Sequence, residues 1–392
     1  MLVGCLWATA AGAQLQGHIS LARDVYLAGE PIYVHFEVTN VGKDPLQYSA
    51  GDPYREGCGA YSIEVSREPA LAHSSCRSVG AGECIVANQI IAGGERQHQS
   101  ILVNFAHDVA KPGNYEIHAV NAFKYGPMTG ETQISAGSQE LKIEARFQIR
   151  VIAGSREDLE AIYRSYVTNL GSNDPEIQRE AERAIVSGAP PWLEDTIVGM
   201  LKQYTSREFA LLGLRNLNTA RSREELAKIV ESTSEYTEQS EMAITYLAQM
   251  GDKKYFPLLR GVAQKDAPNQ ARDHVLAAAE LGGDDALPFL RGLLSSADPN
   301  SRANGVMGLE KTGSRAAVPL LIEELKDPNA DSGKLALSGL TGLTHRNAFA
   351  GGRTNTDPPE EEYGRWSKWW AANGGSVAVY GPRECGEMES LP

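Results

Sequence analysis

The sequence predicts a multidomain β + α protein, in which an N-terminal antiparallel β-sandwich precedes an α-helical solenoid that ends in a tryptophan-rich C-terminal cap. Three observations predict this fold. Apolar and polar residues alternate with period two before residue 153. Beyond it, Pro257, Pro288 and Pro319 recur in a register of 31 residues, which is typical of stacked helix pairs. Several tryptophans then gather near residue 370.

The length of 392 residues agrees with more than one core. We expect four segments, and their boundaries follow the changes of pattern along the chain: a signal peptide over 1–13, a sandwich over 14–153, a solenoid of about six helix pairs over 154–345, and a loop, cap helix and tail over 346–392.

The first 13 residues carry no charge and end in Ala11-Gly12-Ala13, the small-x-small pattern that precedes a signal-peptidase cut. This pattern predicts a secreted, periplasmic or outer-surface protein. Leu2-Val3-Gly4-Cys5 also resembles a bacterial lipobox, so a lipid anchor at Cys5 is the alternative to cleavage. No later apolar run reaches 18 residues, so we expect no transmembrane segment.

Four further cysteines form an even set, which favours disulfides in an oxidising compartment: Cys58, Cys76, Cys84 and Cys385. Four cysteines permit three connectivities, and the sequence does not choose among them. A zinc site is the competing interpretation, but no C-x-x-C pair is present. We therefore predict no metal here.

The N-terminal region contains segments rich in β-formers that alternate apolar and polar residues. They cover Ile32–Val38, Tyr61–Val65, Ile101–Phe105, Tyr115–Val120 and Phe147–Val151. Turn residues separate them, as in Ala28-Gly29-Glu30-Pro31 and Lys111-Pro112-Gly113-Asn114, which favours an antiparallel sandwich over a parallel sheet. About seven strands in such a length fit an immunoglobulin-like fold.

Three short sequences carry a family resemblance: Tyr26 to Ile32 with its Gly-Glu-Pro turn, Phe36 to Asn40, and Lys111 to Tyr115. Together they resemble bacterial secreted immunoglobulin-like modules, including those related to macroglobulin domains. The resemblance implies an extracytoplasmic binding or spacer module and implies no activity.

The helical half shows start and stop signals at matching positions. Asp174, Asp298 and Asp327 each precede a proline, as an N-cap residue precedes the first helical position. Glycines end successive pairs at Gly251, Gly282 and Gly313. These positions are similar to the HEAT family, particularly the short bacterial repeats that also occur in phycobilin lyases. The resemblance implies a solenoid and leaves its function open.

Basic residues lie near the starts of the predicted second helices: Arg179, Arg272, Arg302 and Lys334. They could form a basic stripe on the concave face that binds an acidic partner. The alternative is a ladder in which they pair with the capping aspartates and stabilise neighbouring repeats. The net charge of -13 favours the ladder and disfavours nucleic acid as a partner.

The C-terminal segment places Trp366, Trp369 and Trp370 on one face of a short predicted helix, after a polar loop from His345 to Glu362. We interpret the three rings as a structural cap on the open end of the solenoid. The segment resembles the terminal segment of secreted bacterial HEAT proteins. The alternative is a platform for sugar rings, which would require the tryptophans to face solvent.

The sequence contains no G-x-S-x-G, P-loop, H-E-x-x-H or dinucleotide-binding pattern, so we name no catalytic residue and expect no cofactor. His98, His107 and His118 could meet on neighbouring strands and bind a metal, but ordinary surface histidines are favoured. The sequence thus predicts a non-catalytic scaffold whose solenoid binds a protein or peptide. The alternatives are an envelope-associated enzyme or enzyme subunit, with its site at the sandwich–solenoid junction or under the loop, and a structural spacer.

Overall fold

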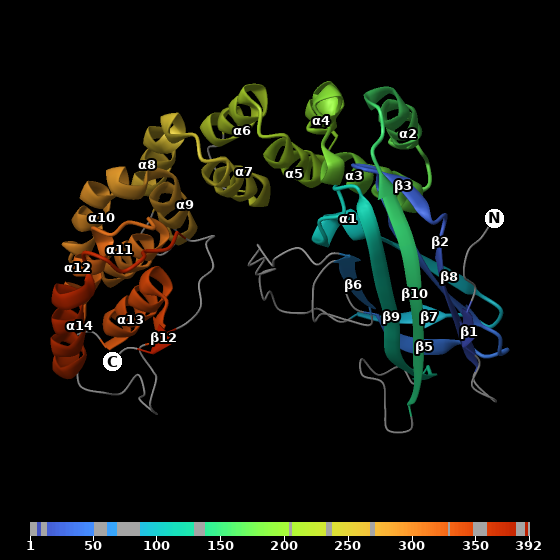
Figure 1. Cartoon of the computed structure of the whole chain (residues 1–392), viewed down its shortest axis with the longest axis horizontal. Helices are drawn as coiled ribbons and strands as arrows, with labels where there is room; N and C mark the ends of the chain where they lie inside the picture. Colours follow the sequence, from blue (N-terminus) through green and yellow to red (C-terminus); the bar gives the residue numbers. More distant parts are fainter. Residues whose placement is uncertain are drawn as a thin grey trace. The chain divides into compact units, whose positions relative to one another are not determined.

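In the computed structural model of the chain, a β-rich N-terminal region is followed by a helical repeat region (Figure 1). The structure describes residues 6–8, 14–50, 61–68, 87–128, 138–203, 206–232, 237–266, 271–327, 330–347, 359–381 and 389–390. The chain folds into two compact units, Met1–Thr196 and Ile197–Pro392. The first helices therefore share a unit with the strands.

The first sheet is antiparallel and has the order β1-β2-β4-β8. Its strands are β1 (Leu6–Ala8), β2 (Leu15–Leu21), β4 (Tyr33–Asn40) and β8 (Arg96–Leu102). β1 lies inside the segment predicted as a leader, and the rest of residues 1–13 lies outside the described residues.

The second sheet has the order β3-β10-β9-β5-β7, and β6 also pairs with β9. Its strands are β3 (Val25–Leu27), β5 (Leu46–Ala50), β6 (Tyr61–Glu68), β7 (Ala87–Ile91), β9 (Gly113–Pro127) and β10 (Gln139–Ile152). β3 runs parallel to β10, a departure from the predicted antiparallel pattern. Only three residues separate β2 from β3, so the chain changes sheets there without a hairpin.

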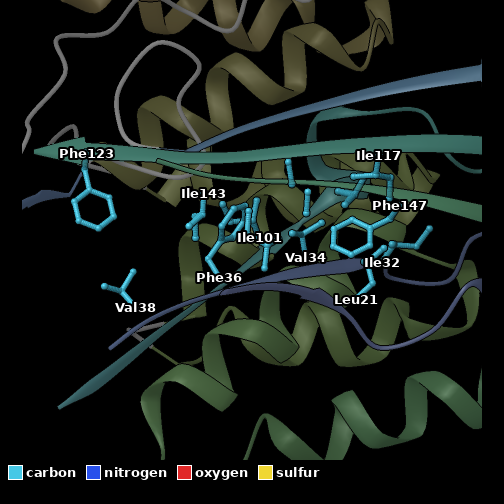
Figure 2. Close-up of a cluster of buried hydrophobic side chains, with 14 of the residues drawn as sticks. Leu21, Ile32, Val34, Phe36, Val38, Ile101, Ile117, Phe123, Ile143 and Phe147 are labelled. Atoms are coloured by element: carbon cyan, nitrogen blue, oxygen red, sulfur yellow. The ribbon is translucent and has the colours of Figure 1, made fainter. Parts of the chain in front are cut away.

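One hydrophobic core contains side chains from both sheets (Figure 2). Period-two alternation produces it, because every second residue of a strand faces inward. Strand β10 alternates buried and exposed residues along most of its length. Phe36 of β4, Ile117 of β9 and Phe147 of β10 are among the buried members, each at most 6% exposed.

The predicted strand Ile101–Phe105 is wrong at its end, because β8 stops at Leu102 and the helical turn α1 covers Val103–Ala106. The strand ends here because the Asn104 side chain, and not a neighbouring strand, bonds the nearby backbone. The Ile32 amide donates to Asn104 Oδ1 over 2.7 Å, and Asn104 Nδ2 donates to the Glu30 carbonyl over 3.0 Å. These bonds turn the chain away from the sheet.

The Gly-Glu-Pro turn before β4 depends on a buried carboxylate. Glu30 is 2% exposed, accepts a hydrogen bond of 2.9 Å from the Leu27 amide, and forms an ion pair with Arg23. Gly29 adopts φ +89°, a conformation that favours glycine.

Two helices pack on this β-rich region within the first unit: α2 (Arg156–Asn169) and α3 (Pro175–Gly188). The predicted start of α3 is confirmed, because the Asp174 side chain accepts from the Glu176 amide and Pro175 follows it. A 3-10 turn, η1 (Pro191–Leu193), comes after α3. The Tyr163 hydroxyl of α2 donates to the Gly29 carbonyl over 3.0 Å, which joins the helix to the turn before β4.

The remaining helices come in successive pairs. α4 (Glu194–Met200) crosses the unit boundary. The second unit continues with α5 (Arg207–Leu217), α6 (Ala220–Ser232), α7 (Glu238–Gln249), α8 (Phe256–Lys265), α9 (Arg272–Gly282), α10 (Leu287–Leu294), α11 (Pro299–Lys311), α12 (Ala317–Glu324) and α13 (Ala330–Thr344). The 3-10 turns η3 (Lys253–Tyr255) and η4 (Gly283–Ala286) precede α8 and α10.

Within the second unit, the second helix of each pair contacts the second helix of the next, so that α9 lies between α7 and α11 and α11 lies between α9 and α13. The 31-residue register explains this order, because Val275 and Val306 occupy the same position on α9 and α11 and both are fully buried. The cap helix α14 (Pro359–Asn373) packs against α12 (Figure 1). A short pair, β11 (Arg346–Asn347) and β12 (Glu389–Ser390), joins two segments near the C-terminus.

Candidate functional site

The predicted basic residues all lie beside carboxylates. Arg302 of α11 lies 3.6 Å from Asp327, and it donates to the carbonyls of Ser296 and Ala297. Arg179 of α3 pairs with Glu176 on its own helix, one turn away. The guanidinium groups of both residues are therefore already engaged.

The other two predicted basic residues are more exposed. Lys334 pairs with Asp331 of α13 over 3.1 Å, and Arg272 lies 4.0 Å from Asp273. Both lie near the N-terminal end of a second helix, as predicted. Each of these two residues has a carboxylate within 4.0 Å, and the basic stripe that binds an acidic partner stays a prediction.

A different polar ladder joins neighbouring repeats, and the sequence reasoning missed it. Arg223 Nη1 lies 3.1 Å from Asp252, Lys253 Nζ lies 3.3 Å from Asp285, and the Ser314 hydroxyl donates to Asp284. The signal was present in the register, because the residues that end successive pairs, Asp252 and Ser314 among them, recur at the same repeat position.

The ladder ends on the C-terminal cap. The Arg315 guanidinium donates to the carbonyls of Gly374 and Val377, and it lies 5.9 Å from the centre of the Trp370 ring. Trp366 is fully buried and Trp369 is 7% exposed. A sugar platform requires open ring faces, which these two rings do not offer.

A cavity of about 370 Å³ lies between two consecutive helix pairs. Four helices or helix ends line it: the end of α8, the start of α9, one face of α10 and the start of α11. Its lining residues are Ala263, Gln264, Asp266, Ala271, Val275, Pro288, Phe289, Gly292, Leu293, Ser301 and Asn304. Apolar walls and a few polar side chains together are typical of a binding site.

A buried pair of titratable residues supports the cavity wall. The Asp266 carboxylate, at the end of α8, hydrogen bonds His274 Nδ1 of α9, and each side chain is 5% exposed. The carboxylate fixes the orientation of the imidazole ring, as such partners do in many sites. We did not expect this pair, because its members lie eight positions apart in the sequence, on either side of a helix connection.

The cavity offers binding chemistry. Val275, Phe289 and Leu293 supply an apolar surface, and the polar side chains of Asp266, Ser301 and Asn304 lie at the same cavity. Ser301 also stands at a capped helix start, because its amide donates to Asp298 Oδ1 over 2.8 Å. This start of α11 is the one predicted from Asp298-Pro299.

The remaining predicted residues divide into two groups. Cys5, Cys58, Cys76, Cys84 and Cys385 lie outside the described residues. The histidines that could have formed a metal site are separated, since His98 is in the first sheet and His118 in the second. Among the residues that the structure describes, no group of three or more His, Cys, Asp or Glu side chains is arranged to hold a metal ion.

Comparison with known proteins identifies the helical repeats. A family model of HEAT repeats matches residues 263–340, which include every residue of the cavity between α8 and α11. No curated protein matches the chain. Among its described segments, no helix is long and apolar enough to cross a membrane.

Two solved structures show weaker likenesses. The complex of CpcE and CpcF of phycocyanin lyase from Nostoc sp. PCC7120 is 18% identical, over 45% of this chain and 75% of that one, with a TM-score of 0.33. A variant of Salmonella alpha-2-macroglobulin is 13% identical over 90% of this chain, with a TM-score of 0.17. The chain spans 27% of the length of that second protein.

Proposed function

We propose that this chain is an extracytoplasmic, non-catalytic scaffold, secreted, periplasmic or on the outer surface, that binds a partner protein through its helical repeats. In this proposal the two sheets form an immunoglobulin-like sandwich and the helix pairs form a HEAT solenoid. The shared core of the two sheets and the HEAT match at 263–340 support the architecture. The leader-like residues 1–13 support the location.

The observation that carries the proposal is the cavity between α8, α9, α10 and α11. Its volume of about 370 Å³ falls at the lower end of the range of about 300–1,000 Å³ for ligand pockets. A cavity of this size suits one large side chain better than a cofactor. The partner would therefore contribute a single anchoring residue, as interface hot spots do.

The lining points to an aromatic anchor with a polar tip. Phe289 and Leu293 would pack against the ring, and Asp266, whose Oδ2 bonds His274, would accept a hydrogen bond from a phenol or indole through Oδ1. Tyrosine and tryptophan combine these two properties and are enriched at interface hot spots. We infer that the partner inserts a Tyr or Trp side chain between the two repeats.

Gly292 provides a direct test, because it lines the cavity and a Cβ added there would meet no atom within 4 Å. Gly292→Leu should fill the cavity without disturbing the helix. Gly261→Leu is the matched control: Gly261 stands 31 residues earlier on α8, a Cβ there also meets nothing within 4 Å, and it is not among the cavity residues.

The measurement is selection of displayed peptides on the full chain, followed by titration of a labelled selected peptide. We expect the selected peptides to share a Tyr or Trp. We also expect Gly292→Leu to weaken binding about tenfold or more, the loss of one hot-spot contact, while Gly261→Leu binds normally. Selected peptides without an aromatic residue, or equal binding by the two variants, would contradict the proposal. The same two variants then test any protein captured from envelope extract.

A further inference from the structure

A second cavity lies in the first unit, where edge strand β8 of one sheet faces β5, β6 and β7 of the other. Its volume is about 220 Å³. Phe36 and Val38 are among its lining residues and are almost fully buried. Gln89, Gln97 and Gln99 contribute three carboxamides to its lining. Such a concentration of neutral hydrogen-bonding groups is unusual beside a hydrophobic core and needs a reason.

The polar groups of this cavity are held in place before any ligand arrives. The buried Tyr48 hydroxyl lies 2.5 Å from Gln97 Oε1 and 2.6 Å from Gln89 Oε1. Gln97 is oriented from its other end, since its Nε2 donates to the Ile90 carbonyl over 2.9 Å. Groups fixed in this way lose little freedom on binding, which favours affinity.

The hydrogen-bond count leaves capacity for a ligand. A phenol carries one proton, and the fixed Gln97 oxygen takes it. The Gln89 oxygen also lies at the Tyr48 hydroxyl, so the Gln89 NH₂ group is directed elsewhere and can donate to a ligand oxygen. Gln99 donates through Nε2 to the Ser100 carbonyl over 3.2 Å, so its carbonyl oxygen can also accept from a ligand.

The lining also defines the charge of the ligand. Burial raises the pKa of Tyr48 and raises the pKa of Tyr61 to about 12, so both phenols remain neutral. Besides the phenols the lining holds two ionisable side chains: the Glu176 carboxylate is paired with Arg179, and the His98 ring stacks on the His35 ring with centroids 5.3 Å apart. A neutral ligand rich in hydroxyl groups is therefore favoured over an ion.

The aromatic residues define the shape of the ligand. The rings of Phe36 and Tyr61 meet edge to face with centroids 5.0 Å apart, and Tyr61 is partly exposed in the cavity lining. The Tyr61 ring offers an apolar surface next to the carboxamides, and the buried Phe36 ring packs against it. The cavity is smaller than the range of about 300–1,000 Å³ for drug-sized ligands, so a single ring fits it better than an extended molecule.

We propose that this cavity binds one neutral pyranose ring, with its C–H face on the Tyr61 ring and its hydroxyls bonded to Gln89, Gln97 and Gln99. The ring would be either a free sugar or the terminal residue of a glycan, since both present the same chemistry. This site is independent of the peptide-binding proposal, because it lies in the other unit and uses none of the helical-repeat cavity.

The test is saturation-transfer NMR of the full chain with methyl β-glycosides of glucose, galactose and N-acetylglucosamine, and with the β-1,4-linked disaccharides of the first and last. We expect at least one glycoside to bind. Gln89→Ala should weaken it about tenfold, the effect of one lost hydrogen bond, and Gln99→Leu should do the same. Gln89 is exposed, so its replacement leaves the core intact.

Gln148→Ala is the matched control, because Gln148 lies on the outer face of β10, where its amide bonds Glu116 over 2.6 Å. Binding of both sugar sizes would identify a glycan end as ligand, and binding of the monosaccharides alone would identify a free sugar. Absence of binding by every glycoside, or binding that Gln89→Ala and Gln99→Leu leave unchanged, would overturn the proposal.

Discussion

The Tyr33 hydroxyl of β4 donates a 2.6 Å hydrogen bond to the Glu180 carbonyl in the middle of α3. Tyr33 is 5% exposed and packs with Leu102 of β8 and Ala184 of α3. A helix of the repeat region and a sheet of the N-terminal region therefore share buried contacts. The first helix pair is part of the β-rich unit, and the unit boundary at Thr196 reflects this.

Tyr33→Phe should lower the free energy of unfolding by about 1–2 kcal/mol, because it removes a hydrogen bond at a buried junction and leaves the ring in place. Tyr363→Phe is the control, since the Tyr363 hydroxyl bonds the exposed Glu323 carboxylate over 3.1 Å. It should cost less than about 0.5 kcal/mol. Urea denaturation measures both, and equal losses would show that the Tyr33 bond does not stabilise the junction.

Gly188→Ala should be strongly destabilising. A Cβ at this last residue of α3 would overlap the hydroxyl oxygen of Tyr163, a ring of α2 that is 2% exposed and donates to the Gly29 carbonyl. We expect a loss of about 2 kcal/mol or more, because a buried ring cannot move aside cheaply. Gly333→Ala should be neutral or slightly stabilising, since a Cβ on α13 meets nothing within 4 Å and alanine favours a helix.

A double-mutant cycle with Tyr163→Phe completes the test of Gly188. Removing the hydroxyl should recover part of the stability lost in Gly188→Ala, because the nearest clash disappears. Additive losses in the double variant would mean that Gly188 is required for another reason.

The sequence predicted helix starts better than it predicted contacts between distant segments. Asp174 and Asp298 cap their helices as expected, because an N-cap depends on residues within one turn. The end of β8 was missed because the Asn104 side chain acts on backbone 72 residues earlier. The Tyr33–Glu180 bond spans 147 residues, and no local pattern encodes such a separation.

The same reasoning applies to the candidate site. The 31-residue register predicted the helices that surround the cavity, but the cavity itself depends on which side chains fall short of filling the space between two pairs. Gly292 has no side chain to fill this space, whereas the residue 31 positions later, at the same place in the next repeat, is Glu323. The Asp266–His274 pair forms only when α8 and α9 fold back on each other, so isolated histidines in the sequence gave no signal.

His35 should make stability depend on pH. It faces His98, with ring centroids 5.3 Å apart, and Ser100, whose hydroxyl lies 2.9 Å from Nδ1; Tyr33 on its own strand also stacks on it. Burial, and then the nearby His98, lower the pKa of His35 to about 4. The unfolded chain therefore binds more protons than the folded chain between about pH 4 and pH 6.5. The contribution of neutral His35 to the free energy of unfolding is complete above pH 6.5 and is lost as the pH falls through 4.

The groups across the junction oppose part of this effect. Burial raises the pKa of Glu180 on α3, although Ser100, His98 and Arg183 lower it again. The contribution of Glu180 to stability is present at low pH and is lost as the pH rises through its pKa in the folded chain. The measurement is therefore the difference in the free energy of unfolding between wild type and His35→Gln. Urea denaturation at several pH values across this window gives that difference. The difference should grow by about 2 kcal/mol from low to high pH, after allowance for partial exposure of the ring.

A control and a contrary result define that test. Ser165→Ala should leave the pH profile of stability parallel to wild type, because Ser165 is exposed on α2, its hydroxyl bonds the Ile162 carbonyl of its own helix, and its replacement removes no titratable group. A constant difference between wild type and His35→Gln across the window would show that His35 does not titrate with a lowered pKa.

The Arg302–Asp327 pair links two repeats, so its reversal tests whether these charges act in stability or in binding. Asp327 is 13% exposed and Arg302 is 23% exposed, which makes the pair less screened than a surface ion pair. Arg302→Glu should cost about 2 kcal/mol, because it sets two carboxylates together and breaks the bonds to Ser296 and Ala297. The double reversal Arg302→Glu, Asp327→Arg should recover part of that loss.

Lys334→Glu, at an exposed intrahelical pair, is the control and should lower the free energy of unfolding by less than about 0.5 kcal/mol. If the double reversal is stable but fails to bind the partner peptide, Arg302 belongs to the interface as well as to the ladder; if it binds normally, the pair is structural.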